Sequence, residues 1–210
     1  MKKSSSFSVT ALSLGIAILF SSVNGITQNT RSVNDAHGLQ IGSLAPDYQA
    51  IDSDSITFIL ADALKKGPVV MIFYRGQWCP YCTKHLSTIQ DSLKLITDRG
   101  ATVVAISPQR PEYLREMVEK TGASFRLLYD ERYAISDAYD VTYTPTTRQL
   151  IRYNTGMQAK LKETQTDDSQ RMPIPATYLI DHDGVIVWRH FDPDYKNRST
   201  IKEILEHLPD

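Results

Sequence analysis

Two kinds of hydrophobic pattern alternate along the chain from about residue 39 onward. Continuous apolar runs, typical of strands buried on both faces, occur at 68–74 and 101–107. Each run is followed by a segment whose apolar residues recur every three or four positions, as in a helix packed on a sheet. This alternation predicts one α/β domain, with a central mixed β-sheet flanked by helices.

The other predicted elements follow the same logic. After the first strand, the helical spacing includes Leu86, Ile89 and Ile96, and Gly100 ends the helix. The closing helix begins with a capping box that joins Thr200 to Glu203. The remaining predictions are helices at 111–120 and 132–139, strands at 125–130, 176–180 and 185–190, and a hairpin turn at 181–184.

One polar stretch, residues 144–172, shows no clear periodicity. A connection of this length is usually functional or contains secondary structure of its own. Its part 148–156 is compatible with either a short strand or a short helix.

The N-terminus has the pattern of a signal peptide. Lys2 and Lys3 precede the apolar run 9–20, and Val23 and Gly25 are small residues suited to a cleavage site after position 25. The run is short for a membrane span, which needs about 20 apolar residues. We expect residues 1–25 to be removed on export to the periplasm or another extracytoplasmic space, with an uncleaved anchor as the alternative.

Composition adds limits on partners. The 210 residues are 41% hydrophobic and 22% charged, as in ordinary globular proteins. The net charge is −1, with no long run of one sign, so no nucleic-acid or membrane-surface partner is expected. Polar residues 26–38 are predicted to be a flexible leader and residues 39–210 the folded domain, with no membrane span after cleavage.

Both cysteines of the chain lie two residues apart, at Cys79 and Cys82. Export to an oxidising compartment permits a disulfide between them. A bridge across so short a loop adds little stability, because the stabilisation grows with loop length. The pair is therefore predicted to be a working disulfide that is made and broken during function.

The local sequence suggests how the pair works. Pro80 suits the first position of a helix, which makes Cys79 the N-cap residue. The helix dipole favours a thiolate there, so the pKa of Cys79 is expected below about 8.5. Arg75 adds to this effect if it points the same way. Cys79 would then attack and Cys82 would resolve the mixed disulfide.

Two other roles for the cysteines remain open. They could be inert core residues, or they could be half of a metal site. Structural zinc needs four ligands, and the five histidines show no paired ligand spacing. His190 is the one candidate for a copper ligand. We expect no metal and no organic cofactor.

The chain resembles the peroxiredoxin-like group of the thioredoxin superfamily, the alkyl hydroperoxide reductase/thiol-specific antioxidant relatives. This resemblance implies a thioredoxin-like fold and extends over residues 41–195. It is found in five stretches: "IGSLAPDYQA" (41–50), "GPVVMIFYRGQWCPYC" (67–82), "ATVVAISPQRPE" (101–112), "LLYDERYAISDAYDV" (127–141) and "PIPATYLIDHDGVIVWRHFDPDY" (173–195).

The resemblance also implies which residues line the site. Trp78, Pro80 and Tyr81 surround the two cysteines in sequence, and Arg75 precedes them. Pro175 stands where thioredoxin folds have a cis-proline packed against the disulfide, so a cis peptide bond is expected before it.

The peroxidase pattern is altered in this chain. Peroxiredoxins use a proline, a threonine and an attacking cysteine, spaced PxxxTxxC, together with a distant arginine. Arg75, Cys79 and Cys82 occupy the three spaced positions, and Pro175 occupies that of the arginine. This alignment makes Cys82 the attacking residue, whereas the local sequence favours Cys79. A peroxide needs hydrogen-bond donors and positive charge, which Arg75 or Arg198 could supply.

Three functions follow from these observations. The resemblance implies a thiol-dependent peroxidase that reduces hydroperoxides and is regenerated by a thioredoxin-like reductant. The CxxC pair and Pro175 suit a reductase or oxidase of protein disulfides. A metal carrier without catalytic activity is the third. Residues 192–195 either line the site or form the turn before the closing helix.

Overall fold

The computed structural model describes residues 31–208. The predicted signal peptide and residues 26–30 of the predicted leader lie outside this range. Among the described residues, no helix is long and apolar enough to cross a membrane.

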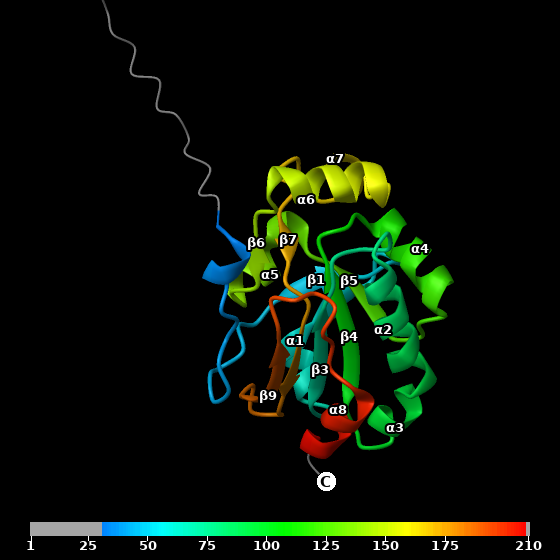
Figure 1. Ribbon diagram of the computed structural model, residues 1–210. Coiled ribbons are helices and arrows are strands. Elements are labelled where there is room, and N and C mark those ends of the chain that lie inside the picture. The colour runs from blue at the N-terminus through cyan, green and yellow to red at the C-terminus, as the bar shows by residue number, and fades with distance from the viewer. Residues whose placement is uncertain (1–30, 209–210) are drawn as a thin grey trace, which may run out of the picture.

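A five-stranded mixed sheet forms the centre of the domain, as predicted (Figure 1). Its central strand β3 pairs in parallel with β4 and antiparallel with β8. All five residues of β3 are buried, which explains its uninterrupted apolar sequence. In sheet order the strands are β5 (Arg126–Tyr129), β4 (Thr102–Ser107), β3 (Val69–Phe73), β8 (Ala176–Ile180) and β9 (Ile186–Phe191).

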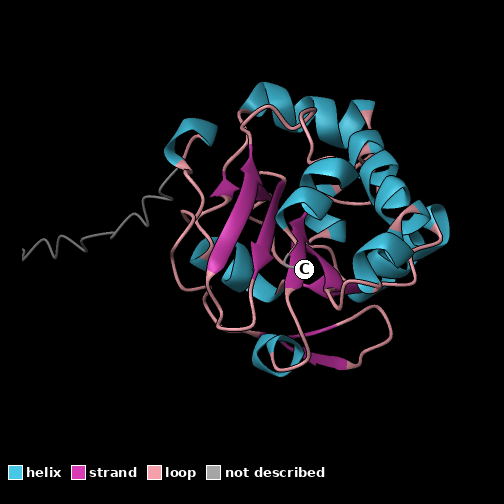
Figure 2. Cartoon of the chain, turned by 90° about the horizontal axis from the view of Figure 1, so that it is seen from below, coloured by secondary structure: helices cyan, strands magenta, loops and turns pink. Residues whose placement is uncertain are grey.

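Helices cover both faces of this sheet (Figure 2). One hydrophobic core contains residues of α2 (Pro80–Asp91), α3 (Leu93–Thr97), α4 (Pro111–Thr121) and α8 (Ile201–His207). The second core, on the opposite face, contains residues of α1 (Leu60–Leu64) and α5 (Ala134–Ala138), which follows the 3₁₀ turn η2 (Glu131–Tyr133).

Two local predictions can be compared with these helices. The capping box of Thr200 and Glu203 is present at the start of α8. The helix predicted to reach Gly100 is interrupted at Ser92, whose non-helical backbone separates α2 from α3. Ile96 of α3 is nevertheless buried in the same core as Leu86 of α2, because the helical spacing resumes after the break.

The start of the described chain is folded onto the domain. Arg31 forms an ion pair with Asp140, and Ser32 forms a capping box with Asp35 in the short turn η1 (Val33–Asp35). Ala36 is buried. The prediction of a flexible leader is therefore wrong for residues 31–38, because its polar residues have partners that lie about 100 positions away in the sequence.

The polar stretch 144–172 forms short helices. They are α6 (Thr147–Ile151), the π-helical turn η3 (Arg152–Gly156) and α7 (Leu161–Thr164). This segment lies at the end of the sheet where α2 begins (Figure 1). Two small antiparallel pairs complete the fold: β1 (Gln49–Ile51) with β2 (Thr57–Ile59), and β6 (Thr142–Tyr143) with β7 (Met172–Pro173).

Candidate active site

The two cysteines lie in the first turn of α2, directly after the buried strand β3. Cys79 is the N-cap residue and Pro80 the first residue of the helix, as predicted. Both cysteines are free thiols, and each has 0% of its surface exposed. A site so completely shielded from water strengthens every electrostatic interaction within it.

The turn between β3 and α2 requires a glycine. Gly76 has a φ of +154°, and a Cβ atom there would come within 2.6 Å of the indole nitrogen of Trp78. It would also collide with the side-chain amide of Gln109. Gly76 therefore lets the chain turn tightly, and Trp78 packs over the turn with only 7% of its surface exposed.

Arg75 occupies the centre of the site and is completely buried. Its Nη2 donates a hydrogen bond to Sγ of Cys79 over 3.1 Å, and its Nη1 donates to the hydroxyl of Tyr153 over 3.2 Å. The guanidinium lies 3.8 Å from the ring centroid of Tyr195 and 5.0 Å from that of Trp78. Burial lowers the pKa of Arg75, but negative charge at the sulfurs raises it by more, so the group stays protonated.

A second arginine reaches the other sulfur from the C-terminal part of the chain. Nη2 of Arg198 donates to Sγ of Cys82 over 3.5 Å, and its Nε donates to the carbonyl of Tyr195 over 2.7 Å. Residues 192–195 thus form a turn before α8 and also contribute to the site. Both arginines that the sequence offered as sources of positive charge contact the cysteine pair.

His85 holds the loop that carries Arg198. Its Nε2 lies 3.1 Å from the carbonyl oxygen of Ser199 and 3.2 Å from the hydroxyl of that residue. The Ser199 hydroxyl is also 2.8 Å from that of Thr177 in β8. Burial, and then the charge of Arg198, lower the pKa of His85 to about 4. A neutral His85 therefore ties α2 to this loop without adding a charge that would repel Arg198.

Sequence reasoning missed His85 and Tyr153. His85 lies three residues after Cys82, on the same side of α2, and this spacing was the one available signal. Tyr153 belongs to the segment that shows no clear pattern. Its ring packs on Trp78, with 5.3 Å between the ring centroids. The segment 144–172 therefore covers the site through Tyr153.

The two thiols differ in acidity, and the prediction for Cys79 is wrong. The pKa of Cys79 is raised, first by its hydrogen bond to Cys82 and then by burial, and Arg75 only partly offsets these effects. Its side chain makes no capping hydrogen bond to the helix. Burial also raises the pKa of Cys82, but the hydrogen bond from Cys79 and the charges of Arg198 and Arg75 lower it well below the usual value. These contacts favour the thiolate on Cys82.

The other predicted site residues lie near the pair to different degrees. Pro80 and Tyr81 are exposed, and the ring of Tyr81 meets Tyr195 edge-on at 5.6 Å. Pro175 is buried at the same end of the sheet, since its neighbour Ala176 pairs with Phe73.

The expected cis bond before Pro175 is wrong, because no cis peptide bond occurs among residues 31–208. Pro175 lies directly before β8 and two residues after the end of β7.

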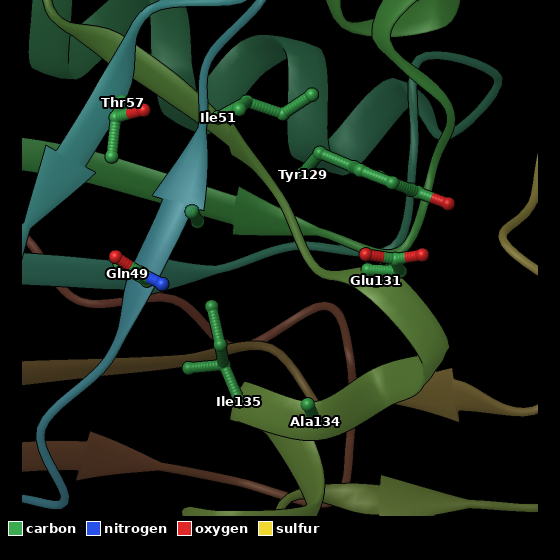
Figure 3. Close-up of a pocket in the computed structure, with 8 residues that line it drawn as sticks. Gln49, Ile51, Thr57, Tyr129, Glu131, Ala134 and Ile135 are labelled. Atoms are coloured by element: carbon green, nitrogen blue, oxygen red, sulfur yellow. The ribbon is translucent and has the colours of Figure 1, made fainter.

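Two further features bear on the kind of site. No group of three or more His, Cys, Asp or Glu side chains suited to a metal ion occurs within the described range. A separate cavity of about 550 Å³ lies between β1, β5 and α5 (Figure 3). Its lining includes Glu131 and Tyr129 but neither cysteine, and Ile135 in its wall belongs to the core on the other face of the sheet. The reactive groups are therefore concentrated at the start of α2.

The fold and the site together define a thioredoxin-fold protein with a buried, arginine-flanked dithiol. The AhpC/TSA family model matches residues 41–189. The chain belongs to the AhpC/TSA family.

Comparisons with individual proteins agree with this assignment. "Peroxiredoxin Bcp" of Bacillus subtilis is 26% identical over 174 residues, which cover 82% of this chain and 96% of that protein. "Thiol-disulfide oxidoreductase ResA" of Geobacillus kaustophilus is 25% identical over 124 residues, 59% of this chain and 70% of that protein. The crystal structure of "Peroxidoxin BcpB" from Mycobacterium tuberculosis has a TM-score of 0.63 at 21% identity, covering 81% and 96% of the two chains. This last likeness concerns the fold.

The position of His85 leads to the first prediction. In His85→Ala, Arg198 is less firmly held, so the pKa of Cys82 rises and its thiolate is protonated at a higher pH. In the wild type the thiolate persists as the pH falls below about 8.5 and is lost only at the lowered pKa of the folded protein. Thiolate absorbance at 240 nm during a pH titration, together with pH-dependent alkylation, measures this shift.

The controls separate positioning from general destabilisation. His85→Gln keeps an N–H donor for Ser199 and should restore a low pKa, whereas the exposed His182→Ala should leave the titration unchanged. Equal titration curves for His85→Ala and the wild type would refute the positioning role.

Proposed function

We propose that this protein is a thiol-dependent peroxidase in which Cys82 attacks the hydroperoxide and Cys79 resolves the product. The observation that supports this most strongly is that Arg198 donates to Sγ of Cys82 and Arg75 donates to Sγ of Cys79, within a fold of the AhpC/TSA family. These charges help to lower the pKa of Cys82. Cys82 also stands at the position of the attacking cysteine in the PxxxTxxC pattern. The relatives named peroxiredoxin support the same reaction.

The first step transfers one oxygen atom. The Cys82 thiolate attacks the terminal oxygen of the hydroperoxide, the O–O bond breaks, and Cys82 becomes a sulfenic acid while an alkoxide or hydroxide leaves. Negative charge develops on the leaving oxygen, and positive groups fixed beside it stabilise the transition state. Arg198 and Arg75 supply this charge in place of the usual threonine and arginine.

The second step closes the disulfide. The raised pKa of Cys79 keeps its proton in the resting enzyme, so this thiol can protonate the leaving oxygen. The resulting Cys79 thiolate attacks the sulfenic acid, the S–O bond breaks, and hydroxide leaves to become water. A thioredoxin-type dithiol then returns two electrons and restores both thiols.

A second function has specific support. A CxxC pair at a helix start also suits thiol–disulfide exchange with other proteins, and the relative named thiol-disulfide oxidoreductase favours it. In that case Cys79 is the attacking residue and an oxidised protein replaces the hydroperoxide. The two functions therefore assign opposite roles to the same cysteines.

Export is the other part of the proposal. The signal-peptide pattern of residues 1–25 supports export of the mature protein to the periplasm or another extracytoplasmic space. There it would protect against hydroperoxides that arise outside the cytoplasm.

Rapid kinetics tests the peroxidase activity. Reduced protein mixed with hydrogen peroxide should show a fast change in tryptophan fluorescence, because Trp78 adjoins Cys79, with a second-order constant of about 10⁴ M⁻¹s⁻¹ or more. Cys79→Ser should retain the fast oxidation phase, and Cys82→Ser should lose it.

Two results would count against this assignment. A rate no better than that of a small free dithiol would exclude the peroxidase. Mixed disulfides trapped with other proteins through Cys79 in a Cys82→Ser variant would then establish the exchange function.

Mass spectrometry of the mature protein tests export. After expression of the full chain in a Gram-negative host, the periplasmic fraction should contain protein that begins at Ile26. Protein that still begins at Met1 and sediments with membranes would support an uncleaved anchor, and a full-length soluble form in the cytoplasm would refute export.

A further inference from the structure

A cavity of about 560 Å³ lies beside the cysteine pair, between α2 and the loop that leads into α8. Arg198, whose guanidinium contacts Cys82, lines this cavity. The exposed Tyr81, from the CxxC motif itself, forms another part of its wall. The cavity is therefore lined both by a residue of the CxxC motif and by the arginine that contacts the proposed attacking cysteine.

The charged side chains that line this cavity are all positive. Lys84, Lys196 and Arg198 line it, and no Asp or Glu does. Within residues 31–208, none of these three cations forms an ion pair with a carboxylate. His85 in the wall stays neutral near pH 7, since its pKa is about 4. An anion inside the cavity would meet two lysines that have no carboxylate partner, together with Arg198, whose charge also faces Cys82.

The volume of the cavity and its apolar surfaces limit the size and the chemical character of the ligand. Small-molecule sites usually measure about 300–1,000 Å³, which suits a small organic compound better than a segment of a protein. The Tyr81 ring, Ile201 and the aliphatic stems of the two lysines offer apolar contact to its body.

We propose that this cavity binds the anionic group of an organic hydroperoxide, so that the preferred oxidant has a carboxylate or phosphate besides its hydroperoxyl group. The inference rests on the peroxidase function proposed above. The lysines attract and hold the anionic end, and the hydroperoxyl end reaches Cys82 past Arg198. The chemical step is unchanged: Cys82 gains the terminal oxygen and the anionic alcohol leaves.

Binding of unreactive probes tests the site independently of catalysis. Titration calorimetry of the reduced protein would compare octanoate and octyl phosphate with the neutral 1-octanol. We expect at least one anion to bind about tenfold more tightly than octanol, with the difference shrinking as salt increases. The stronger of the two anions distinguishes a carboxylate from a phosphate ligand.

Charge reversal provides the matched comparison. Lys84→Glu/Lys196→Glu should abolish the preference for the anion, whereas Lys66→Glu/Lys162→Glu, which changes the net charge equally elsewhere, should keep it. The proposal is overturned if octanol binds as tightly as both anions, or if the preference survives in the first variant. Binding of hexaglutamate without either octyl anion would also overturn it, in favour of an acidic protein segment.

Kinetics links the site to substrate choice. The ratio of kcat/KM for a carboxylate-bearing hydroperoxide to that for tert-butyl hydroperoxide should fall about tenfold in Lys84→Glu/Lys196→Glu, and an unchanged ratio would contradict the proposal. If neither hydroperoxide is reduced by the wild type, the peroxidase function fails, and the binding comparison still decides whether the cavity is an anion site.

Discussion

The structure of the site depends on one interaction, the pairing of the buried Arg75 and the partly buried Arg198 with negative charge on the buried cysteine pair. A charge removed from water is costly unless an opposite charge or several hydrogen bonds compensate it. In the described chain, Arg75 has hydrogen bonds to a tyrosine hydroxyl and to Cys79, and it forms no ion pair with a carboxylate. Negative charge on the cysteine pair is thus its counter-charge, and the arginines in turn keep that charge on sulfur.

This mutual dependence connects the site to distant parts of the fold. Tyr153 comes from the segment 144–172, and Tyr195 and Arg198 come from the loop before α8. Oxidation to a disulfide removes the negative charge while both guanidinium groups remain. The segment 144–172 and the loop before α8 therefore surround a different net charge in the reduced and the oxidised state. Both segments also shield the sulfurs from solvent.

The sequence predicted the features that local chemistry determines. Buried strands appear as apolar runs, Pro80 marks the first residue of a helix, and the spacing of the two cysteines places both in its first turn. The α/β fold with a mixed sheet, the capping box of α8 and the position of Cys79 at the N-cap could therefore be predicted.

The features set by contacts between distant segments could not be predicted. The sequence offered Arg198 as a source of charge but could not place it against Cys82, because α2 and that loop are 116 positions apart. The acidity of Cys79 was misjudged for the same reason: the helix dipole is a local effect, whereas burial and the hydrogen bond to Cys82 arise in the folded site. The fold of residues 31–38 likewise depends on distant contacts, such as the ion pair of Arg31 with Asp140.

Chemical trapping of the oxidised cysteine tests the central claim most directly. Each single-cysteine variant, Cys79→Ser and Cys82→Ser, would be treated with one equivalent of hydroperoxide in the presence of dimedone, which labels sulfenic acids, and analysed by mass spectrometry. The account predicts rapid labelling of Cys82 in the first variant and little of Cys79 in the second. Preferential labelling of Cys79 would contradict the assignment of the thiolate to Cys82.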